Sequence, residues 1–156
     1  KMIHHELSKE FYIKHGQLLC ASFLYWTGKQ LVPIQKNDDD FILTLFEAPF
    51  VVVSHGVEDV TIFNFGNKIA LDLFELDWSS FIKLPSRESV EIKSQPEREK
   101  LIQQVAKDGF IDNYSGIRIS SSGKRFIVQD AIIWNIIDNS GVYYGQAAMF
   151  KNWYYQ

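Results

Sequence analysis

Cysteine and long apolar runs are both scarce in this chain. Cys20 is the only cysteine, so the chain can form no internal disulfide and no cluster of metal-binding thiolates, as is typical of a reducing compartment. Uninterrupted apolar stretches are only a few residues long, whereas a helix needs about 20 apolar residues to span a membrane. The N-terminal residues contain no secretory leader pattern. We therefore expect a cytoplasmic protein that has no membrane partner.

A strong excess of charge of one sign is also missing. The 156 residues carry a formal net charge of −3, which argues against a broad face for phosphate groups, and we expect no direct contact with nucleic acid. The hydrophobic fraction of 46% and the aromatic fraction of 15% are those of a globular chain. A chain of this length is expected to form one domain that buries about 70% of its unfolded surface.

The motifs of common catalytic and metal sites are absent as well. No two of the four histidines (His4, His5, His15 and His55) have the four-residue spacing of a helical zinc site. No serine lies in a G-x-S-x-G motif, and no glycine-rich phosphate loop is present. The acidic run Asp38–Asp40 is typical of a helix start, and His55 is expected to bond the backbone rather than a metal or haem. The sequence therefore predicts no catalytic residue, no metal site and no enzyme.

Apolar spacing predicts several helices in the first two thirds of the chain. Residues 8–26 place apolar side chains three, four and seven apart, and Gly28 ends this helix. Further helices are expected within residues 36–49, 68–76, 78–84 and 94–109, with Asp77 and Ser94 as N-caps. The predicted inward face of the first helix consists of Phe11, Leu18, Leu19, Ser22 and Tyr25.

Three long predicted strands follow, between residues 109 and 150. SSSG at 120–123 and DNSG at 138–141 supply tight turns, and consecutive strands joined by tight turns run antiparallel. Two shorter strands are expected earlier, at residues 50–57 and 61–65. Five strands with a cluster of helices inserted after the second predict an α+β fold.

The order of these elements resembles the PAS fold, a five-stranded antiparallel sheet of order 2-1-5-4-3 that encloses a ligand-sized cup with the inserted helices. Five segments carry a closer resemblance to the MEKHLA domain, a PAS-like family: LYWTGKQLVP, FNFGNKIALDLFE, KLPSR, DGFIDNYSGIRISSSGKRF and WNIIDNSGVYYGQAAMFKNW. This family occurs alone in bacteria and at the C-terminus of some plant homeodomain-leucine-zipper transcription factors. The resemblance implies an N-terminal helix and linker over residues 1–39, packed on the domain or on a partner, and a PAS-like domain over residues 40–156. It implies no activity.

Strand alternation divides the polar residues of the three long strands between the two faces of the sheet. By similarity to PAS hairpins, Arg118, Ser120 and Gln146 are predicted to point into the cup. Gln129 has the same predicted direction, but counting from the two turns disagrees by one residue there, which predicts a β-bulge in the middle strand. The convex face is expected to carry an apolar surface that the N-terminal helix or a partner subunit covers: Phe126, Val128, Ile132, Trp134 and Ile136.

Arg118 is the predicted ligand-binding cation, because a planar guanidinium group binds two oxygens of a carboxylate or phosphate at once. Gln129 and Gln146 are predicted to supply amide donors and acceptors to the same small ligand, whose anionic group would face Arg118. Secondary contributions to this predicted site are expected from Arg87, Trp134 and Ser120.

The leading interpretation is a non-catalytic sensory or interaction domain that binds a small ligand, a protein partner, or both. A ligand in the cup would adjust the sheet and pass the change to the N-terminal helix and to a homodimer interface. Two alternatives stay open: an enzyme that acts on a small acid in the cup, and a purely structural dimerisation domain. Arg118 would bind no ligand if it instead pairs with an acid such as Asp72 or Asp130, or reaches solvent at the edge of the sheet.

The sequence assigns no cofactor. Flavin photosensors that resemble this fold carry a reactive cysteine in the inserted helices, where this chain reads KLPSRESVE, and Cys20 lies in the first helix instead. Covalent flavin photochemistry is therefore excluded, whereas non-covalent flavin binding stays open. Haem is disfavoured because the inserted helices contain no histidine.

Overall fold

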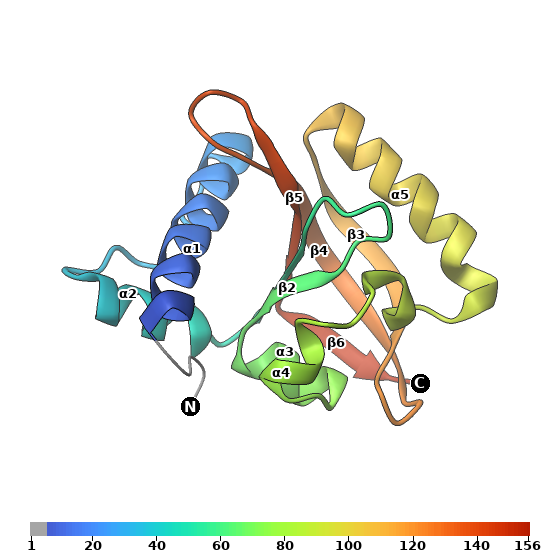
Figure 1. Cartoon of the computed structure of the whole chain (residues 1–156). Coiled ribbons are helices and arrows are strands. Elements are labelled where there is room, and N and C mark those ends of the chain that lie inside the picture. Colours follow the sequence, from blue (N-terminus) through green and yellow to red (C-terminus); the bar gives the residue numbers. More distant parts are fainter. Residues whose placement is uncertain (1–5) are drawn as a thin grey trace.

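The predicted order of elements is confirmed by the computed structural model, which describes residues 6–156 and the side chains from residue 9 onward. His4 and His5 lie outside the described residues. Figure 1 shows the helices and strands along the chain. They are α1 (Glu6–Thr27), α2 (Asp38–Phe46), β1 (Val51–His55), β2 (Phe63–Gly66), α3 (Lys68–Phe74), α4 (Trp78–Phe81), the 3₁₀ turns η1 (Ser86–Ser89) and η2 (Ile92–Ser94), α5 (Gln95–Asp108), β3 (Phe110–Ile119), β4 (Arg125–Ile137), β5 (Tyr143–Phe150) and β6 (Asn152–Tyr155).

The strands form one antiparallel sheet of order β2-β1-β5-β4-β3, as predicted. Ala148 of the central strand β5 pairs with Val53 on one side and with Ile133 on the other. The short strand β6, which the sequence did not predict, continues beyond β5 and pairs with the first half of β4. Strands that are distant in the sequence therefore meet at the centre of the sheet.

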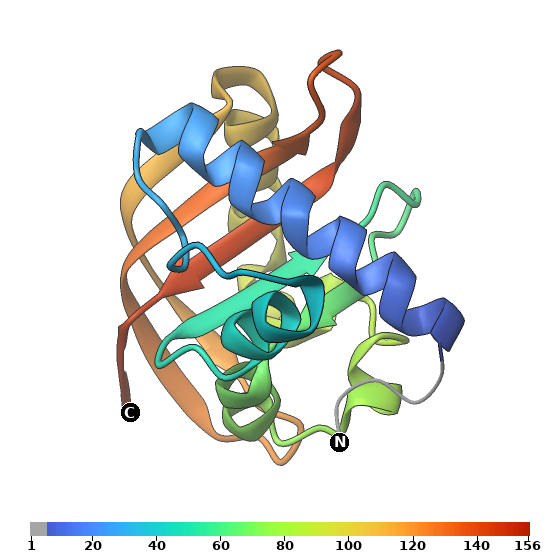
Figure 2. The same ribbon diagram turned by 90° about the vertical axis from the view of Figure 1, so that its left-hand side faces the viewer.

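Helices cover both faces of this sheet. α1 and α2 lie against one face, and α5 lies across the other, with α3 and α4 near the lower end (Figure 1). Figure 2 shows α1 running the length of the face that it covers. We name this the convex face, toward which Val52, Trp134 and Ile136 point. The opposite face, the cup, carries Val53 and Ile133.

Side-chain caps start three of the short helices, and of these caps only Asp77 was predicted. Asn37, Asn67 and Asp77 each accept a hydrogen bond from the backbone N–H three residues on, which caps α2, α3 and α4. Ser94 makes no such side-chain bond at the start of α5. Gly109 ends α5 at φ +95°, a conformation that glycine adopts without strain. No helix among residues 6–156 has the length and apolar character needed to cross a membrane.

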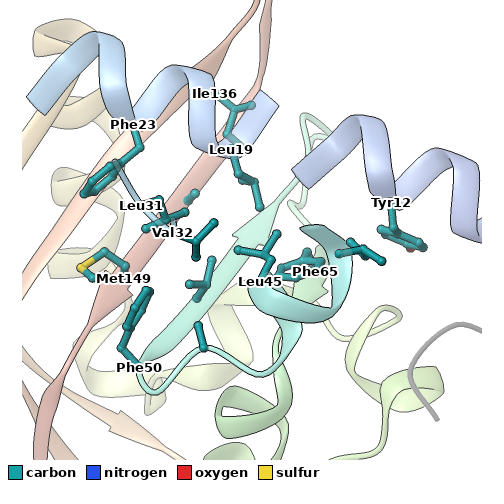
Figure 3. Close-up of a cluster of buried hydrophobic side chains, with 14 of the residues drawn as sticks. Tyr12, Leu19, Phe23, Leu31, Val32, Leu45, Phe50, Phe65, Ile136 and Met149 are labelled. Carbon is teal, nitrogen blue, oxygen red and sulfur yellow. The ribbon is translucent and has the colours of Figure 1, made fainter. Parts of the chain in front are cut away.

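The face that α1 buries differs from the predicted stripe. Phe11 and Tyr25 are 54% and 70% exposed, whereas Leu19 and Ser22 are buried as predicted. Tyr12, Leu19 and Phe23 project from α1 into a cluster with Phe65, Ile136 and Met149 of the sheet (Figure 3).

Polar contacts explain which stripe of α1 is buried. His15 Nε2 lies 2.8 Å from Ser54 Oγ, and Ser22 Oγ donates to the Ile137 carbonyl at 2.8 Å. Trp26 Nε1 donates to the backbone carbonyl of Asn135 at 2.9 Å. These groups would be costly to bury without partners, and the sheet supplies their partners only when this stripe faces inward.

The predicted bulge in the middle strand is present and corrects the assignment of faces around it. Asp130 has φ +54°, and the pairing with β3 shifts between the partners of Val128 and Ala131. In a regular strand, residues on the same face are separated by one residue. Val128 and Ala131 both point into the cup although two residues separate them, because the bulge adds one residue. Phe126 also belongs to the buried cluster of the cup. The prediction that Phe126 and Val128 lie on the convex face was therefore wrong. Ile132, Trp134 and Ile136 lie on the convex face as predicted.

Candidate ligand-binding cavity

The cup contains a cavity of about 80 Å³ between the sheet and α5. Strands β1, β3, β4 and β5 and helix α5 all contribute to its walls. Apolar side chains form most of the lining, including Val53, Ile133, Leu101 and Phe150. The polar residues of the lining include His55, Arg98, Arg118 and Gln146. A small apolar space with a few convergent polar groups is the usual form of a ligand site.

Arg98 brings a buried cation to this cavity. Its side chain extends from the inner face of α5 and is 7% exposed. Nη2 donates to Ser86 Oγ at 2.7 Å, and Nη1 lies 3.7 Å from a carboxylate oxygen of the exposed Glu99. Burial lowers the pKa of Arg98 to about 10, and the positive charge of Arg118 acts in the same direction. The guanidinium group is therefore still charged at neutral pH.

Arg118 lies beside Arg98 and is half-buried. Its Nη1 donates to the carbonyl of Ile117 at 2.9 Å, and its guanidinium carbon lies 5.7 Å from the centre of the Tyr114 ring. No carboxylate of the described part of the chain forms a salt bridge with it, and neither of the acids predicted as structural partners does so. The prediction that Arg118 points into the cup agrees with its place in the cavity wall.

The two arginines separate the inner cavity from an outer hollow. Arg98, Tyr114 and Arg118 line both spaces, and the outer one has a volume of about 230 Å³. Glu97 is the carboxylate that lines the outer hollow. The guanidinium groups can thus be reached from the outside, while the far end of the cavity is enclosed by the sheet.

His55 ends β1 with its ring inside the cavity. Nδ1 lies 3.0 Å from the Gly56 carbonyl oxygen, which can only accept, so Nδ1 carries the proton. Burial lowers the pKa of His55 to about 4, and the charge of Arg98 adds to this effect. The ring is therefore neutral at pH 7, and Nε2 is an acceptor that is buried and has no hydrogen-bond partner. The predicted backbone bond is confirmed, but the sequence did not predict that His55 lines the cavity.

Gln146 lies on the central strand with its amide fixed in one orientation. Nε2 donates to the Ile102 carbonyl at 3.0 Å and to Asn135 Oδ1 at 3.2 Å. Asn135 Nδ2 in turn donates to the carbonyl of Ala106, so its Oδ1 must be the accepting end. These bonds place Gln146 Oε1 on the opposite side, where it is buried and has no partner. Its predicted position in the cup agrees with the structure.

The other four predicted site residues lie outside the cavity. Gln129 is half-buried beside the bulge, opposite Asn152 of β6. Ser120 donates to Glu75 Oε1 at 2.6 Å. Arg87 is exposed, and Trp134 is buried under α1 on the convex face. The structure therefore brings Arg118 and Gln146 together and leaves these four apart.

Arg98 is the site residue that the sequence reading missed most clearly. It precedes Leu101, Ile102 and Val105 by three, four and seven residues, so it lies on the apolar face of the same helix. A cation on the apolar face of a helix predicts a buried charge, and this pattern is visible in the sequence. His55 carried no comparable signal, because the direction of a residue at the end of a strand depends on the turn that follows.

A five-stranded antiparallel sheet of this order, with helices inserted after the second strand and a cavity beneath them, defines a PAS-type domain. The MEKHLA domain model matches residues 13–155, and the chain belongs to this family. A PAS domain from Colwellia psychrerythraea has a TM-score of 0.62 at 10% identity, over 71% of this chain and 92% of that one. The predicted fold and family are therefore both confirmed.

Rice proteins are among the relatives that the sequence itself identifies. The homeobox-leucine zipper protein HOX10 of Oryza sativa subsp. indica is 24% identical over 139 residues. The match covers 86% of this chain but only 16% of the rice protein. The name of this relative gives no support to the predicted absence of nucleic-acid contact.

The cavity does not fit a flavin of the light-sensing type. A light-oxygen-voltage domain studied with a flavin analogue has a TM-score of 0.59 at 13% identity, over 75% of this chain and 84% of that one. A space of about 80 Å³ is far smaller than the roughly 300–1,000 Å³ of sites for larger ligands. Cys20 lies in α1 away from the cavity, and burial raises the pKa of its thiol to about 12. Within residues 6–156, no three His, Cys, Asp or Glu side chains are grouped to hold a metal.

Proposed function

We propose that this domain is a non-catalytic sensory module whose cup binds a small organic acid. The observation that carries the proposal is the buried guanidinium group of Arg98, which faces the cavity beside a second cation, Arg118. Burial of a charge is costly unless an opposite charge and hydrogen bonds compensate it. Here the opposite charge is Glu99, which is 57% exposed and 3.7 Å away. An anion bound between the arginines would supply the missing compensation.

The form of the ligand follows from the shape of the site. Each guanidinium group offers a planar fork of N–H donors that matches the two oxygens of a carboxylate. The apolar walls suit a short carbon skeleton behind that carboxylate. The cavity of about 80 Å³ is smaller than the roughly 150 Å³ cavity known to hold one benzene molecule, so the enclosed part of the ligand has few non-hydrogen atoms.

A binding role is favoured over catalysis by the protonation state of the site. His55 is the neutral base that faces the cavity, and its pKa of about 4 makes it a weak base at neutral pH. A guanidinium group is a donor and not an acceptor, so the two arginines of the site supply no base. An enzyme acting on an acid in this cup would need a stronger base close to Arg118.

The hydrogen bonds of the central strands offer a route from the cavity to α1. Gln146 bonds the side chain of Asn135, whose backbone carbonyl accepts the indole N–H of Trp26. On β1, His55 faces the cavity while the preceding Ser54 contacts His15 of α1. A ligand that moves either strand would change how α1 is held. We propose that a partner protein binds differently when α1 is held differently. The homodimer, the division of the chain at residue 39 and the cytoplasmic location stay predictions.

The test is thermal unfolding of the protein with added propionate, with sodium chloride at equal ionic strength as the reference. Binding stabilises the folded state, and each kcal/mol raises the melting temperature by about 2–4 °C in a domain of this size. Arg98→Met should abolish the rise. Lys100→Met removes a cation from an exposed position of the same helix and should leave the rise unchanged.

Two results would contradict this function. One is the absence of stabilisation by every acid of a series from formate to butyrate, together with a native mass that equals bare protein chains. The other is an equal loss of stabilisation in Arg98→Met and Lys100→Met, because it would show that the acids act through general charge.

A further inference from the structure

Two buried acceptors in the cavity lack donors. His55 Nε2 and Gln146 Oε1 are both excluded from solvent, and neither has a hydrogen-bond partner among the described residues. A buried acceptor without a donor destabilises the folded state, because it has lost its hydrogen bonds to water and gained none. Two of them in one small space, contributed by different strands, indicate that the occupant of the cavity provides the donor.

Neither acceptor can reverse its role. The proton of the neutral His55 ring is held on Nδ1 by the Gly56 carbonyl, so Nε2 offers only a lone pair. The amide of Gln146 points its N–H groups at Ile102 and Asn135, so a flip would set Oε1 against two oxygens. Gln146 acts in the opposite direction, because its acceptor oxygen favours a proton on His55 and raises the pKa, but the effect of burial is larger and the pKa falls to about 4.

The site thus has two chemically different ends. The arginines at the boundary with the outer hollow suit an anion, and the acceptor pair at the sheet suits an O–H or N–H group. An ammonium group would introduce a positive charge beside Arg98 and Arg118, whereas a hydroxyl group would not. We infer that the ligand is a small hydroxy acid, whose carboxylate contacts the arginines and whose hydroxyl donates to His55 Nε2 or Gln146 Oε1. This inference rests on the proposed binding of an acid.

The test compares acids that differ by one hydroxyl group. Titration calorimetry measures the binding of propionate and of both enantiomers of lactate. One lactate enantiomer should have a dissociation constant at least about tenfold lower than that of propionate. The reason is that a site that hydrogen-bonds a hydroxyl group discriminates against the analogue without it. His55→Phe removes Nε2 and keeps a flat ring. In this variant the preference for lactate should fall to about threefold or less, while propionate still binds.

A measurement on the unaltered protein makes the test independent of how well the variant folds. In ¹⁵N NMR of histidine-labelled protein, lactate should shift the resonance of His55 Nε2 as a nitrogen that accepts a hydrogen bond, and propionate should not. His15 Nε2 lies on the convex face and serves as the internal control.

Each outcome separates this inference from the proposed function. Equal binding of lactate and propionate would overturn the inference that the ligand carries a hydroxyl group, and it would leave the proposed acid binding intact. A water molecule would then donate to the two acceptors. Tighter binding of alanine than of lactate would overturn the hydroxyl in favour of an ammonium group. Binding of none of these acids would contradict both the inference and the proposed function.

Discussion

The two faces of the sheet each bury a histidine, and the difference between these histidines separates folding from function. Burial lowers the pKa of His15 and of His55 to about 4, so both rings are neutral at pH 7. On the convex face, Nε2 of His15 meets Ser54 Oγ at 2.8 Å. In the cup, Nε2 of His55 meets no partner. Ser54 and His55 are adjacent on β1 and point to opposite faces. The ring on the convex side has a hydrogen-bond partner for Nε2, whereas the ring in the cup has none.

The same contrast holds for the surroundings of the two histidines. The convex face packs against aromatic and aliphatic side chains of α1 and α2, and Phe23 lies edge-on against Trp134 with 4.9 Å between ring centres. A hollow of about 230 Å³ lies at the edge of this face, beside Leu31 and Met149. The indole N–H of Trp134 is the exception there, since it is buried without a partner. The cup instead combines a cavity, a buried cation and unpaired acceptors. Close packing stabilises the convex face, whereas the proposed ligand would supply the hydrogen-bond partners that the cup lacks.

The largest expected difference between the faces is in the cost of removing a leucine. Leu19 is fully buried on the convex face, and Leu19→Ala should lower the free energy of unfolding by about 3–5 kcal/mol. Leu101 lines the cavity and is half-buried, so Leu101→Ala should cost only about 1–2 kcal/mol, because a half-exposed side chain removes less apolar surface from water. Urea unfolding followed by circular dichroism measures both values. Equal losses would contradict the distinction between a filled face and a hollow one.

Acid should destabilise the protein through both histidines. The pKa of each is about 4 when folded, below the ordinary 6.5, so unfolding takes up a proton. The stability from the neutral rings is present above pH 6.5 and is lost as the pH falls from 6.5 to 4. A shift of this size corresponds to about 3 kcal/mol for each ring.

Variants assign this acid sensitivity to the two faces. The unfolding free energy of His15→Phe and of His55→Phe should fall less steeply between pH 7 and pH 4 than that of the unaltered protein, by about 3 kcal/mol each. Lactate should shift the NMR titration of His55 and leave that of His15 unchanged. A pH dependence that neither substitution alters would show that other groups cause the acid sensitivity.

The sequence predicted the sheet well, because alternation, turn residues and helix caps are local signals. SSSG and DNSG mark both hairpins, and Asp77 caps α4 as expected. The faces of α1 and β4 were harder to predict. Phe11 and Tyr25 have the spacing of a core stripe, but the partners of His15 and Ser22 on distant strands decide which stripe is buried. Such partners are not visible in a local pattern.

The candidate site was predicted in part for the same reason. Gln146 follows a tight turn at a countable distance, and its predicted direction agrees with the structure. Gln129 directly precedes the bulge at Asp130, which changes the alternation of faces by one residue. Arg98 and His55 come from elements that meet the long strands only in three dimensions. A pocket built from seven elements has no signature in any one of them.

The smallest expected effect on stability is also the one that most directly separates function from folding. Arg98→Met replaces a buried guanidinium group with an apolar chain of similar length, which removes the cost of burying a charge together with the bond to Ser86 Oγ. Ser86 keeps a partner in Thr61, so no buried group loses its last hydrogen bond. We expect a change within about 1 kcal/mol in the free energy of unfolding, together with loss of acid binding. A loss of about 3–5 kcal/mol would instead identify Arg98 as a structural residue and remove the main support for a ligand between the two arginines.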